Sequence, residues 1–417
     1  MPRVNYGGPW RDAGENERIS RDDPFLLTLG GTGTGTNTFA GNLVDLGGAN
    51  TLIISKIGSG TWILGGTNIL NQVNTFTPDG GNYSTVVEGT LLATQFASLP
   101  GVADDGWFAE AGATLAVRAG GGGEWTGANL DVLLGDGGNT WAFDTGSKLG
   151  IEVTGANNFT YGNDIAGTSY APAESASKGL VKLGTGTPTL TGTSTYTGAT
   201  AVNVGTLVAA NAAALGTTAA ETVVDSGATL DVRANIGLEE LTIGGAGVGG
   251  NGALITSATF TGTVGGAVVL TANTSLGGDG TLNVNGAVTG GFNVTKVGAG
   301  PTIFAVGSLA GVGNLTTSAG TTNVSSVIGT GTSSVTANAT TNFYVSQTLA
   351  SLTIGDGVEV TFGDGLPFAG GGGNSAHRPS FPSRAPSACC SSACSACSTA
   401  AVMRKPKIFP GLIGAGP

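Results

Sequence analysis

Residues 180–207 read LVKLGTGTPTLTGTSTYTGATAVNVGTL, and this stretch contains the signals that decide the fold. A lysine precedes two glycines, and a Tyr-Thr-Gly step and a Gly-Thr-Leu step follow, with short apolar runs between them. Glycine and threonine are poor helix formers, and no apolar stripe with a helical period is sustained. The stretch therefore predicts short strands that are separated by glycine-rich turns.

The same landmarks recur along the chain at a spacing of about 115 residues. The K-x-G-x-G step begins at each of three lysines, which are Lys56, Lys182 and Lys296. The Gly-Thr step downstream of each lysine begins at Gly89, Gly205 and Gly320. Because several independent landmarks share one spacing, chance matching of glycines is a poor explanation. We predict three modules near 115 residues within residues 28–365.

The strands within each module are too short to be stable alone. In Thr229–Val232 and Thr281–Val284, alternating side chains indicate strands with one face directed inward. Stacked coils would pair every strand with copies above and below at about 4.8 Å. We therefore predict an all-β solenoid over residues 28–365, with about 20–25 residues per coil. A string of small sandwiches is the alternative, but its hairpin signals are sparse.

Residues 180–207 resemble the autotransporter-associated β-strand repeat, with the lysine, the glycine pair, Tyr-Thr-Gly and Gly-Thr-Leu in register. Two positions depart from that pattern: Pro188 replaces the usual leucine and Ser194 the usual asparagine. Proline lacks a backbone donor, so we expect Pro188 at a strand edge or corner. The resemblance implies a right-handed parallel β-helix on the outside of a Gram-negative-type cell.

The composition of the chain excludes several classes of protein. Of 417 residues, 76 are glycine, 40% are hydrophobic and only 10% are charged, which does not match a disordered chain. The net charge of −11 disfavours nucleic acid and anionic membranes as partners. His377 is the single histidine and all four cysteines follow residue 388, so the body offers no histidine dyad or multi-histidine metal site.

The two ends of the chain differ from the body. Residues 1–27 are polar and lack the apolar region of a secretory signal, so we interpret them as a misassigned or truncated start. We expect residues 366–417, a Ser/Ala/Cys/Pro-rich tail, to be disordered. A metal site at Cys389, Cys390, Cys394 and Cys397 is disfavoured, because a partner cluster is missing.

Our preferred interpretation of the tail is a shifted reading frame. In the shifted frame the codons are compatible with Pro-Glu-Pro, an apolar run and consecutive arginines. This layout resembles a PEP-CTERM sorting signal, which in relatives directs export, processing and surface attachment. On this interpretation, membrane attachment would require a C-terminal anchor that is not intact in this chain.

Acidic residues are the first candidates for chemistry. The densest acidic zone comprises Asp104, Asp105, Glu110, Asp131, Asp136 and Asp144. A glycosidase needs two carboxylates held about 5–9 Å apart in a cleft, but these acids fall mostly in turns that suit aspartate. Gly-Asp-Gly steps at 135–137, 278–280, 355–357 and 363–365 lack the tandem nonapeptide of calcium-binding solenoids.

Lysine and tryptophan complete the candidates. We expect Lys56, Lys182 and Lys296 to be exposed beside turns rather than catalytic. Four tryptophans cluster in the first module, namely Trp62, Trp107, Trp125 and Trp141, and core packing or capping of the solenoid end is favoured over sugar stacking.

Taken together, the sequence predicts no catalytic, cofactor-binding or metal-binding residues. We predict a non-enzymatic solenoid that is secreted or displayed on the outer surface of a Gram-negative-type bacterium, with a structural or adhesive role. Surface polysaccharide or extracellular matrix is the expected partner. The alternative is a carbohydrate-active β-helix enzyme, a polysaccharide lyase or hydrolase, which would need convergent charged side chains on adjacent coils.

Overall fold

The computed structural model describes residues 3–7, 25–31, 35–44, 52–70, 83–102, 106–135, 142–166, 178–329, 331–363, 368–370 and 401–404. The chain divides into two compact units, Met1–Thr242 and Ile243–Pro417. The expected disorder at both ends and the shifted-frame interpretation fall on residues that lie almost entirely outside the described ones. The three-module division stays a prediction.

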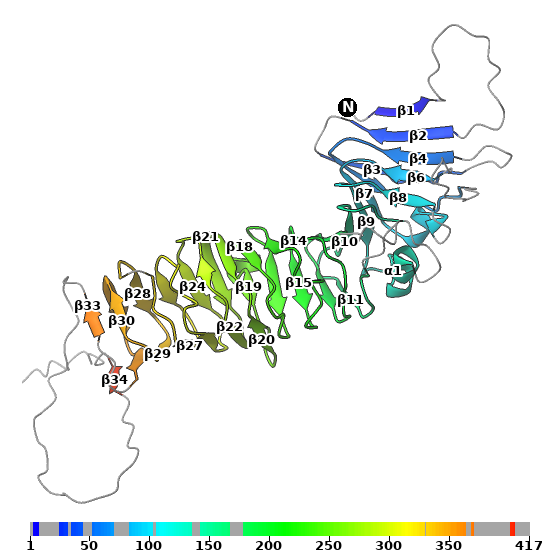
Figure 1. Cartoon of the computed structure of the whole chain (residues 1–417). Coiled ribbons are helices and arrows are strands. Elements are labelled where there is room, and N and C mark those ends of the chain that lie inside the picture. Colours follow the sequence, from blue (N-terminus) through cyan, green and yellow to red (C-terminus); the bar gives the residue numbers. More distant parts are fainter. Residues whose placement is uncertain are drawn as a thin grey trace, which may run out of the picture. The chain divides into compact units, whose positions relative to one another are not determined.

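The first unit is a stack of coils in which each strand pairs with strands one coil earlier and one coil later (Figure 1). Its strands are β1 (Arg3–Gly7), β2 (Phe25–Gly30), β3 (Thr36–Phe39), β4 (Leu52–Lys56), β5 (Thr61–Leu64), β6 (Ser84–Val86), β7 (Thr90–Ala93), β8 (Trp107–Ala109), β9 (Thr114–Arg118), β10 (Lys148–Glu152), β11 (Asn158–Tyr161), β12 (Gly179–Leu183), β13 (Thr187–Leu190), β14 (Thr200–Val202), β15 (Thr206–Ala209), β16 (Thr222–Val224) and β17 (Thr229–Val232). The pairings from β2 onward are parallel, whereas β1 is antiparallel to β2.

Short helices interrupt the coils of the first unit. A 3-10 helix covers Phe96–Ser98, and α1 (Gly127–Leu134) lies between β9 and β10. Thr126 begins α1 through a reciprocal capping box with Asn129, and Gly135 ends it in the left-handed conformation. Within the described residues, no helix is long and apolar enough to span a membrane.

The second unit follows β18 (Leu241–Gly245), which lies at the boundary, and it contains a 3-10 helix at Val248–Gly250. Its strands are β19 (Leu254–Ile255), β20 (Thr261–Val264), β21 (Val268–Gly277), β22 (Thr281–Val284), β23 (Val288–Thr289), β24 (Val294–Val297), β25 (Thr302–Phe304), β26 (Leu315–Thr317), β27 (Thr321–Val324), β28 (Ser334–Ala337), β29 (Thr340–Phe343), β30 (Gln347–Leu349), β31 (Ser351–Ile354), β32 (Glu359–Phe362), β33 (Phe368–Gly370) and β34 (Ala401–Arg404).

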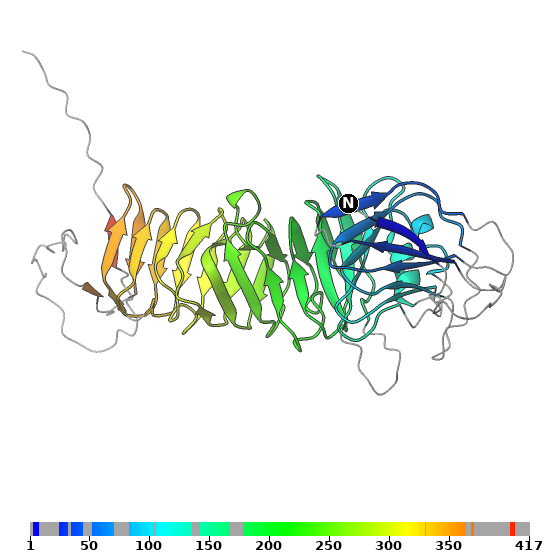
Figure 2. The ribbon, with the colours of Figure 1, turned by 90° about the horizontal axis from the view of Figure 1, so that it is seen from above.

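Two parallel sheets form the main faces of the second unit, and their strands lie side by side coil after coil (Figures 1 and 2). One sheet has the order β20-β22-β25-β27-β29-β32, with β34 added antiparallel at its edge. The other runs from β21 through β24, β26 and β28 to β31. The all-β parallel β-helix predicted from the sequence is therefore confirmed.

The core consists of columns of inward side chains, one from each coil. In the first of these sheets, alternate residues of the strands are buried, and Val324, Phe343 and Phe362 occupy one register position. The rings of Phe343 and Phe362 stack with centroids 5.0 Å apart. This arrangement explains the alternation in Thr281–Val284, because every second residue of that strand reaches the core. The same expectation is wrong for Thr229–Val232, where all four residues are buried.

Hydrogen bonds between neighbouring coils report the coil length. In the second unit, asparagine side chains bond to backbone groups 20 or 21 positions away, within the predicted coil of 20–25 residues. The last coils are shorter than predicted, since the register advances 19 residues from Phe343 to Phe362 and 17 from Val335 to Leu352. In the first unit, Ile54 bonds to Ser84 and Arg118 to Glu152, which are 30 and 34 positions apart. These coils are longer than predicted because they carry insertions such as α1.

Pro188 lies inside a strand rather than at a corner. It is the second residue of β13, buried, and paired in register with Phe159 of β11. On the opposite side of β13, pairing with β15 begins only at Thr189. The Thr187 N–H donates to the Asn157 carbonyl of the preceding coil, so the backbone nitrogen of Pro188 faces β15 on the following coil. The missing N–H is tolerated because hydrogen bonding between β13 and β15 begins only after Pro188.

Candidate functional site

The three motif lysines are buried, so the expectation that they are exposed beside turns is wrong. Lys56, Lys182 and Lys296 have exposed fractions of 0%, 1% and 0%. Each occupies an inward column: Lys182, for example, lies in register between Ile151 of β10 and Val202 of β14. A core position normally excludes lysine unless its ammonium group is fully bonded.

The ammonium groups of these clamp lysines (Lys56, Lys182 and Lys296) donate to backbone carbonyls of two successive coils. Lys182 Nζ donates to the carbonyls of Leu183, at 3.0 Å, and Gly184 in its own coil, and to Val204, at 2.7 Å, in the next coil. Lys56 makes the corresponding bonds to Ile57, Gly58 and Glu88, and Lys296 bonds to Gly298, Gly300 and Ala319. Each ammonium therefore uses three donors to join one coil to the next.

The glycine of the downstream Gly-Thr step completes this arrangement. Gly205 has a φ of +73°, and a Cβ placed on it would lie 2.5 Å from Lys182 Nζ, 2.7 Å from the Gly184 carbonyl oxygen and 2.9 Å from that of Gly186. Gly89 and Gly320 have positive φ values and equivalent contacts with the other two clamp lysines. Only glycine fits, because the backbone of one coil passes directly over the ammonium of the previous one.

Burial lowers the pKa of the clamp lysines. The pKa of Lys182 falls to about 8 from its usual 10.5, with the charge of Glu152 opposing the fall, and the pKa of Lys296 falls to about 8 against the charge of Asp279. Burial also lowers the pKa of Lys56, and Glu88 opposes this. With its donors committed to backbone, such an ammonium is positioned to hold coils together and not to act on a substrate.

The acidic candidates that the structure describes have separate local partners. Asp131, on α1, accepts from Tyr161 Oη at 2.7 Å and from Asn163 Nδ2 at 2.8 Å. Asp144 caps the turn before β10 by accepting from the Thr145 N–H at 2.7 Å, and the carbonyl of Glu110 accepts from the Ala113 N–H in a turn. Asp104, Asp105 and Asp136 lie outside the described residues.

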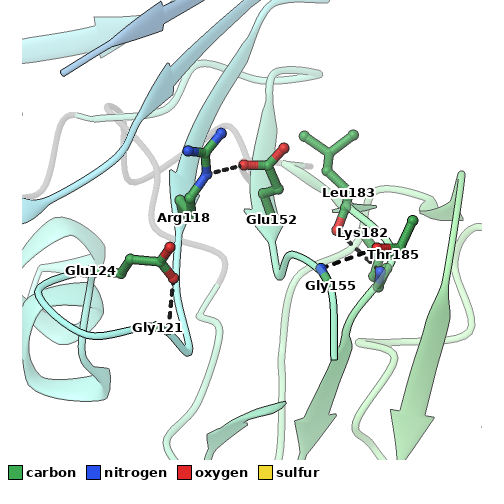
Figure 3. Close-up of polar contacts among 8 residues, drawn as sticks. All are labelled: Arg118, Gly121, Glu124, Glu152, Gly155, Lys182, Leu183 and Thr185. Atoms are coloured by element: carbon green, nitrogen blue, oxygen red, sulfur yellow. Dashed lines mark hydrogen bonds and ion pairs between the residues drawn. The ribbon is translucent and has the colours of Figure 1, made fainter. Parts of the chain in front are cut away.

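Two oppositely charged side chains on neighbouring strands of adjacent coils form an ion pair. Arg118 of β9 donates to Glu152 of β10 at 2.5 Å, and Lys182 of β12 follows on the next coil (Figure 3). Glu124 accepts from the Gly121 N–H within its own loop. These contacts are the pairing of neighbours along a stack, and Arg118 and Glu152 neutralise each other.

The Gly-Asp-Gly step at 278–280 has a structural use. Asp279 Oδ1 accepts from the Ala299 N–H of the next coil at 2.8 Å. Asp136 and Asp364 lie outside the described residues. In the part of the chain that the structure describes, no group of three or more His, Cys, Asp or Glu side chains could hold a metal ion.

Three of the four tryptophans pack in the core of the first unit, as predicted. Trp62, Trp107 and Trp125 have exposed fractions of 4%, 0% and 2%. Trp107 Nε1 donates to the Pro100 carbonyl at 2.9 Å, and the ring of Trp125 meets Phe96 edge-on. Trp141 lies outside the described residues.

A buried polar cluster in the first unit was not predicted from the sequence. Glu239 accepts from Thr222 Oγ1 at 2.7 Å, and Tyr196 Oη lies 2.6 Å from Thr200 Oγ1, one coil away from Thr222. Burial raises the pKa of Glu239 to about 7 from its usual 4.5, against the effect of the Thr222 hydrogen bond. Burial also raises the pKa of the Tyr196 phenol. Tyr196 belongs to the Tyr-Thr-Gly step, but no pattern marked Glu239.

A fourth buried lysine has a different environment. Among the described residues, Lys178 Nζ has no hydrogen-bond partner, and it lies 5.3 Å from the centroid of the Phe143 ring, within range of a cation–π contact. Burial lowers its pKa to about 8, against the charge of Asp164.

Comparison with known proteins identifies one segment. Residues 180–209 match the model of the passenger-associated-transport-repeat family. The matched segment runs from β12 to β15 and contains Lys182, its acceptor carbonyls and Gly205. No curated protein and no solved structure matches the chain. The chain thus carries a repeat of the autotransporter passenger type, and the sequence features of that repeat coincide with the lysine contacts that join its coils.

Proposed function

We propose that this chain is a non-catalytic, passenger-like β-solenoid that is secreted or displayed on the outer surface of a Gram-negative-type bacterium, with a structural or adhesive role. One observation carries the proposal. The lysine and glycines that define the transport-repeat segment are committed to joining coils, since Lys182 donates to carbonyls of two successive coils beneath Gly205. The repeat is therefore a device for building a scaffold.

The distribution of charge supports a scaffold over an enzyme. Glycan cleavage needs two carboxylates held about 5–9 Å apart in a cleft. The described candidates Asp131 and Asp144 are instead bonded to separate local groups. We propose surface polysaccharide or extracellular matrix as the partner of this scaffold.

The proposal is tested in cells that produce the chain together with the flanking sequence of its gene. We expect externally added protease to degrade the protein on intact cells, or the protein to be recovered from the medium, while a cytoplasmic marker stays intact. Purified protein should release no reducing ends or unsaturated sugars from a panel of polysaccharides. Recovery only from lysed cells would contradict the location, and released product would contradict the non-catalytic role.

We further propose that the tail at residues 366–417 contains a PEP-CTERM sorting signal read in a shifted frame. The concentration of serine, alanine and all four cysteines there supports this interpretation. Sequencing of the locus should show a Pro-Glu-Pro triplet before an apolar run in the shifted frame. A shifted frame without that triplet would refute the interpretation.

A further inference from the structure

One face of the second unit carries a column of hydroxyl groups. Strands β21, β24, β26, β28 and β31 pair in parallel register, so equivalent residues lie about 4.8 Å apart from coil to coil. The outward side chains at one register position form what we name the hydroxyl column, which consists of Ser275, Thr295, Thr316, Thr336 and Thr353.

The hydroxyl column is not used within the protein. None of its five side chains forms a hydrogen bond with another residue in the part of the chain that the structure describes. One inward pair is satisfied within the core, where Thr317 Oγ1 lies 2.9 Å from Thr341 Oγ1, whereas the inward hydroxyls of Thr302 and Thr322 have no hydrogen-bond partner among the described residues. The outward hydroxyls are thus available as donors and acceptors for a partner outside the solenoid.

A second column of amides runs beside the first and is held rigidly. Asn273 Oδ1 accepts from the Asn293 N–H at 3.0 Å, Asn293 Oδ1 from the Asn314 N–H at 2.9 Å, and Asn314 Oδ1 from the Ser334 N–H at 2.8 Å. These bonds fix each side chain and leave its amide nitrogen as an outward donor. The two columns are separated along each strand by two residues, or about 6.6 Å.

The two columns carry no charge. Residues 243–363 contain only four charged side chains, Asp279, Lys296, Asp356 and Glu359, and Lys296 is buried. None of the four belongs to either column. An anionic or cationic partner would lose hydration on this face without gaining a counter-ion, so the face suits a neutral partner.

Shallow hollows border the face at both ends of its strands. One of about 500 Å³ is lined by Gly291, Asn293 and Asn314 among others, and Phe292, between two lining residues, is 38% exposed. The other, of about 450 Å³, is lined by Asn338, Gly357 and Glu359 among others, so one carboxylate lies at that end, outside both columns. The face is therefore a flat strip between two recesses, with one exposed aromatic ring at its edge, and its shape suits an extended chain better than a small molecule.

We propose that this strip binds a neutral polysaccharide that extends along the stack of coils. The ligand must offer repeated hydroxyls, carry no charge and repeat at close to the coil spacing. An extended β-1,4-linked hexose chain meets all three conditions, because its advance per sugar is close to the separation of adjacent coils. This inference rests on the proposed function and names the class of polymer and the surface that receives it.

The test removes three hydroxyls from the column without changing side-chain volume. The variant carries Thr295→Val, Thr316→Val and Thr336→Val, and its matched control carries Thr261→Val, Thr281→Val and Thr321→Val at outward positions of the opposite sheet. Purified proteins are sedimented with amorphous cellulose, chitin and insoluble β-1,3-glucan, and circular dichroism verifies the fold. We expect wild type and control to bind cellulose or chitin and the column variant to lose about tenfold or more in affinity, whereas binding to the β-1,3-glucan alone would contradict the match of spacing.

Several results would overturn the proposal. Wild type could bind none of the neutral glycans, the two triple variants could lose affinity equally, or polygalacturonate could compete better than a neutral glucan. Self-association of wild type that the column variant abolishes would assign the face to a second copy of this chain. Because purified protein is used, failure here is distinct from failure of the proposed location, which protease treatment of intact cells measures separately.

Discussion

Replacement of Gly205 by alanine tests whether the contact between lysine and backbone determines the repeat. Gly205 has a φ of +73°, where a side chain costs about 1–2 kcal/mol. The added Cβ would also lie within 3.0 Å of Lys182 Nζ and of the carbonyl oxygens of Gly184 and Gly186. Steric overlap in a packed interior increases the destabilisation by about 1–3 kcal/mol. The lower conformational entropy of the unfolded chain with alanine reduces it by about 0.4–1 kcal/mol. We therefore expect Gly205→Ala to destabilise its coil by about 2–4 kcal/mol.

Gly227 provides the matched control for this substitution. Its φ is +89°, but a Cβ at this position would meet nothing within 4 Å, so Gly227→Ala should cost only about 1 kcal/mol. Hydrogen exchange measured by mass spectrometry, on peptides that cover β14–β15 and β16–β17, gives the free energy of local opening for each coil. Equal losses in the two variants, within about 0.5 kcal/mol, would refute the argument that contact with Lys182 reserves position 205 for glycine.

Three further predictions concern other buried groups. The pKa of Glu239 is about 7 in the folded chain and 4.5 when exposed, so folding takes up a proton between pH 4.5 and 7. Protonation of Glu239 therefore stabilises the folded chain, and this contribution is complete below pH 4.5 and is lost as the pH rises through 7. Glu239→Gln should therefore flatten the dependence of the unfolding free energy on pH between 4.5 and 7, whereas Asp225→Asn, at an exposed position, should leave it unchanged. Reductive methylation at pH 7 followed by peptide mapping should label exposed Lys148 and spare the clamp lysines, and rapid labelling of Lys182 in native protein would contradict its burial. Phe343→Ala should lower the free energy of unfolding by about 3–5 kcal/mol in urea titrations, because it opens a cavity beside Phe362, and a loss under 1 kcal/mol would contradict the stacked core.

The fold was predictable because short-range and long-range signals agreed. Alternation in strands such as Thr281–Val284 gave their inward faces, and the recurrence of the lysine step gave the stacking. The same spacing of two residues would have placed Lys182 on the inward face with Leu180, and both residues are buried. The general preference of lysine for solvent outweighed that local signal in the prediction, and the prediction was wrong.

Other features depend on contacts between residues far apart in the sequence. Glu239 is buried because Thr222 and Tyr196 come from other turns of the chain, and no motif surrounds it. The sequence did not predict the long coils of the first unit, because the repeat of about 115 residues spans several coils and does not show which of them carries an insertion such as α1. Pro188 was misplaced because the sequence does not show which neighbouring coil its backbone would have to bond.

The asparagine bonds between coils also constrain how a gene for such a chain can change in length. Each Oδ1 in the ladder reaches a backbone group 20 or 21 positions later. Insertion of a single codon within a strand would turn its outward residues inward and break the ladder, whereas loss or duplication of one whole coil would rejoin equivalent positions. Recombination between near-identical segments could thus add or remove whole coils, changing the extent of the presented surface while its pattern stays the same.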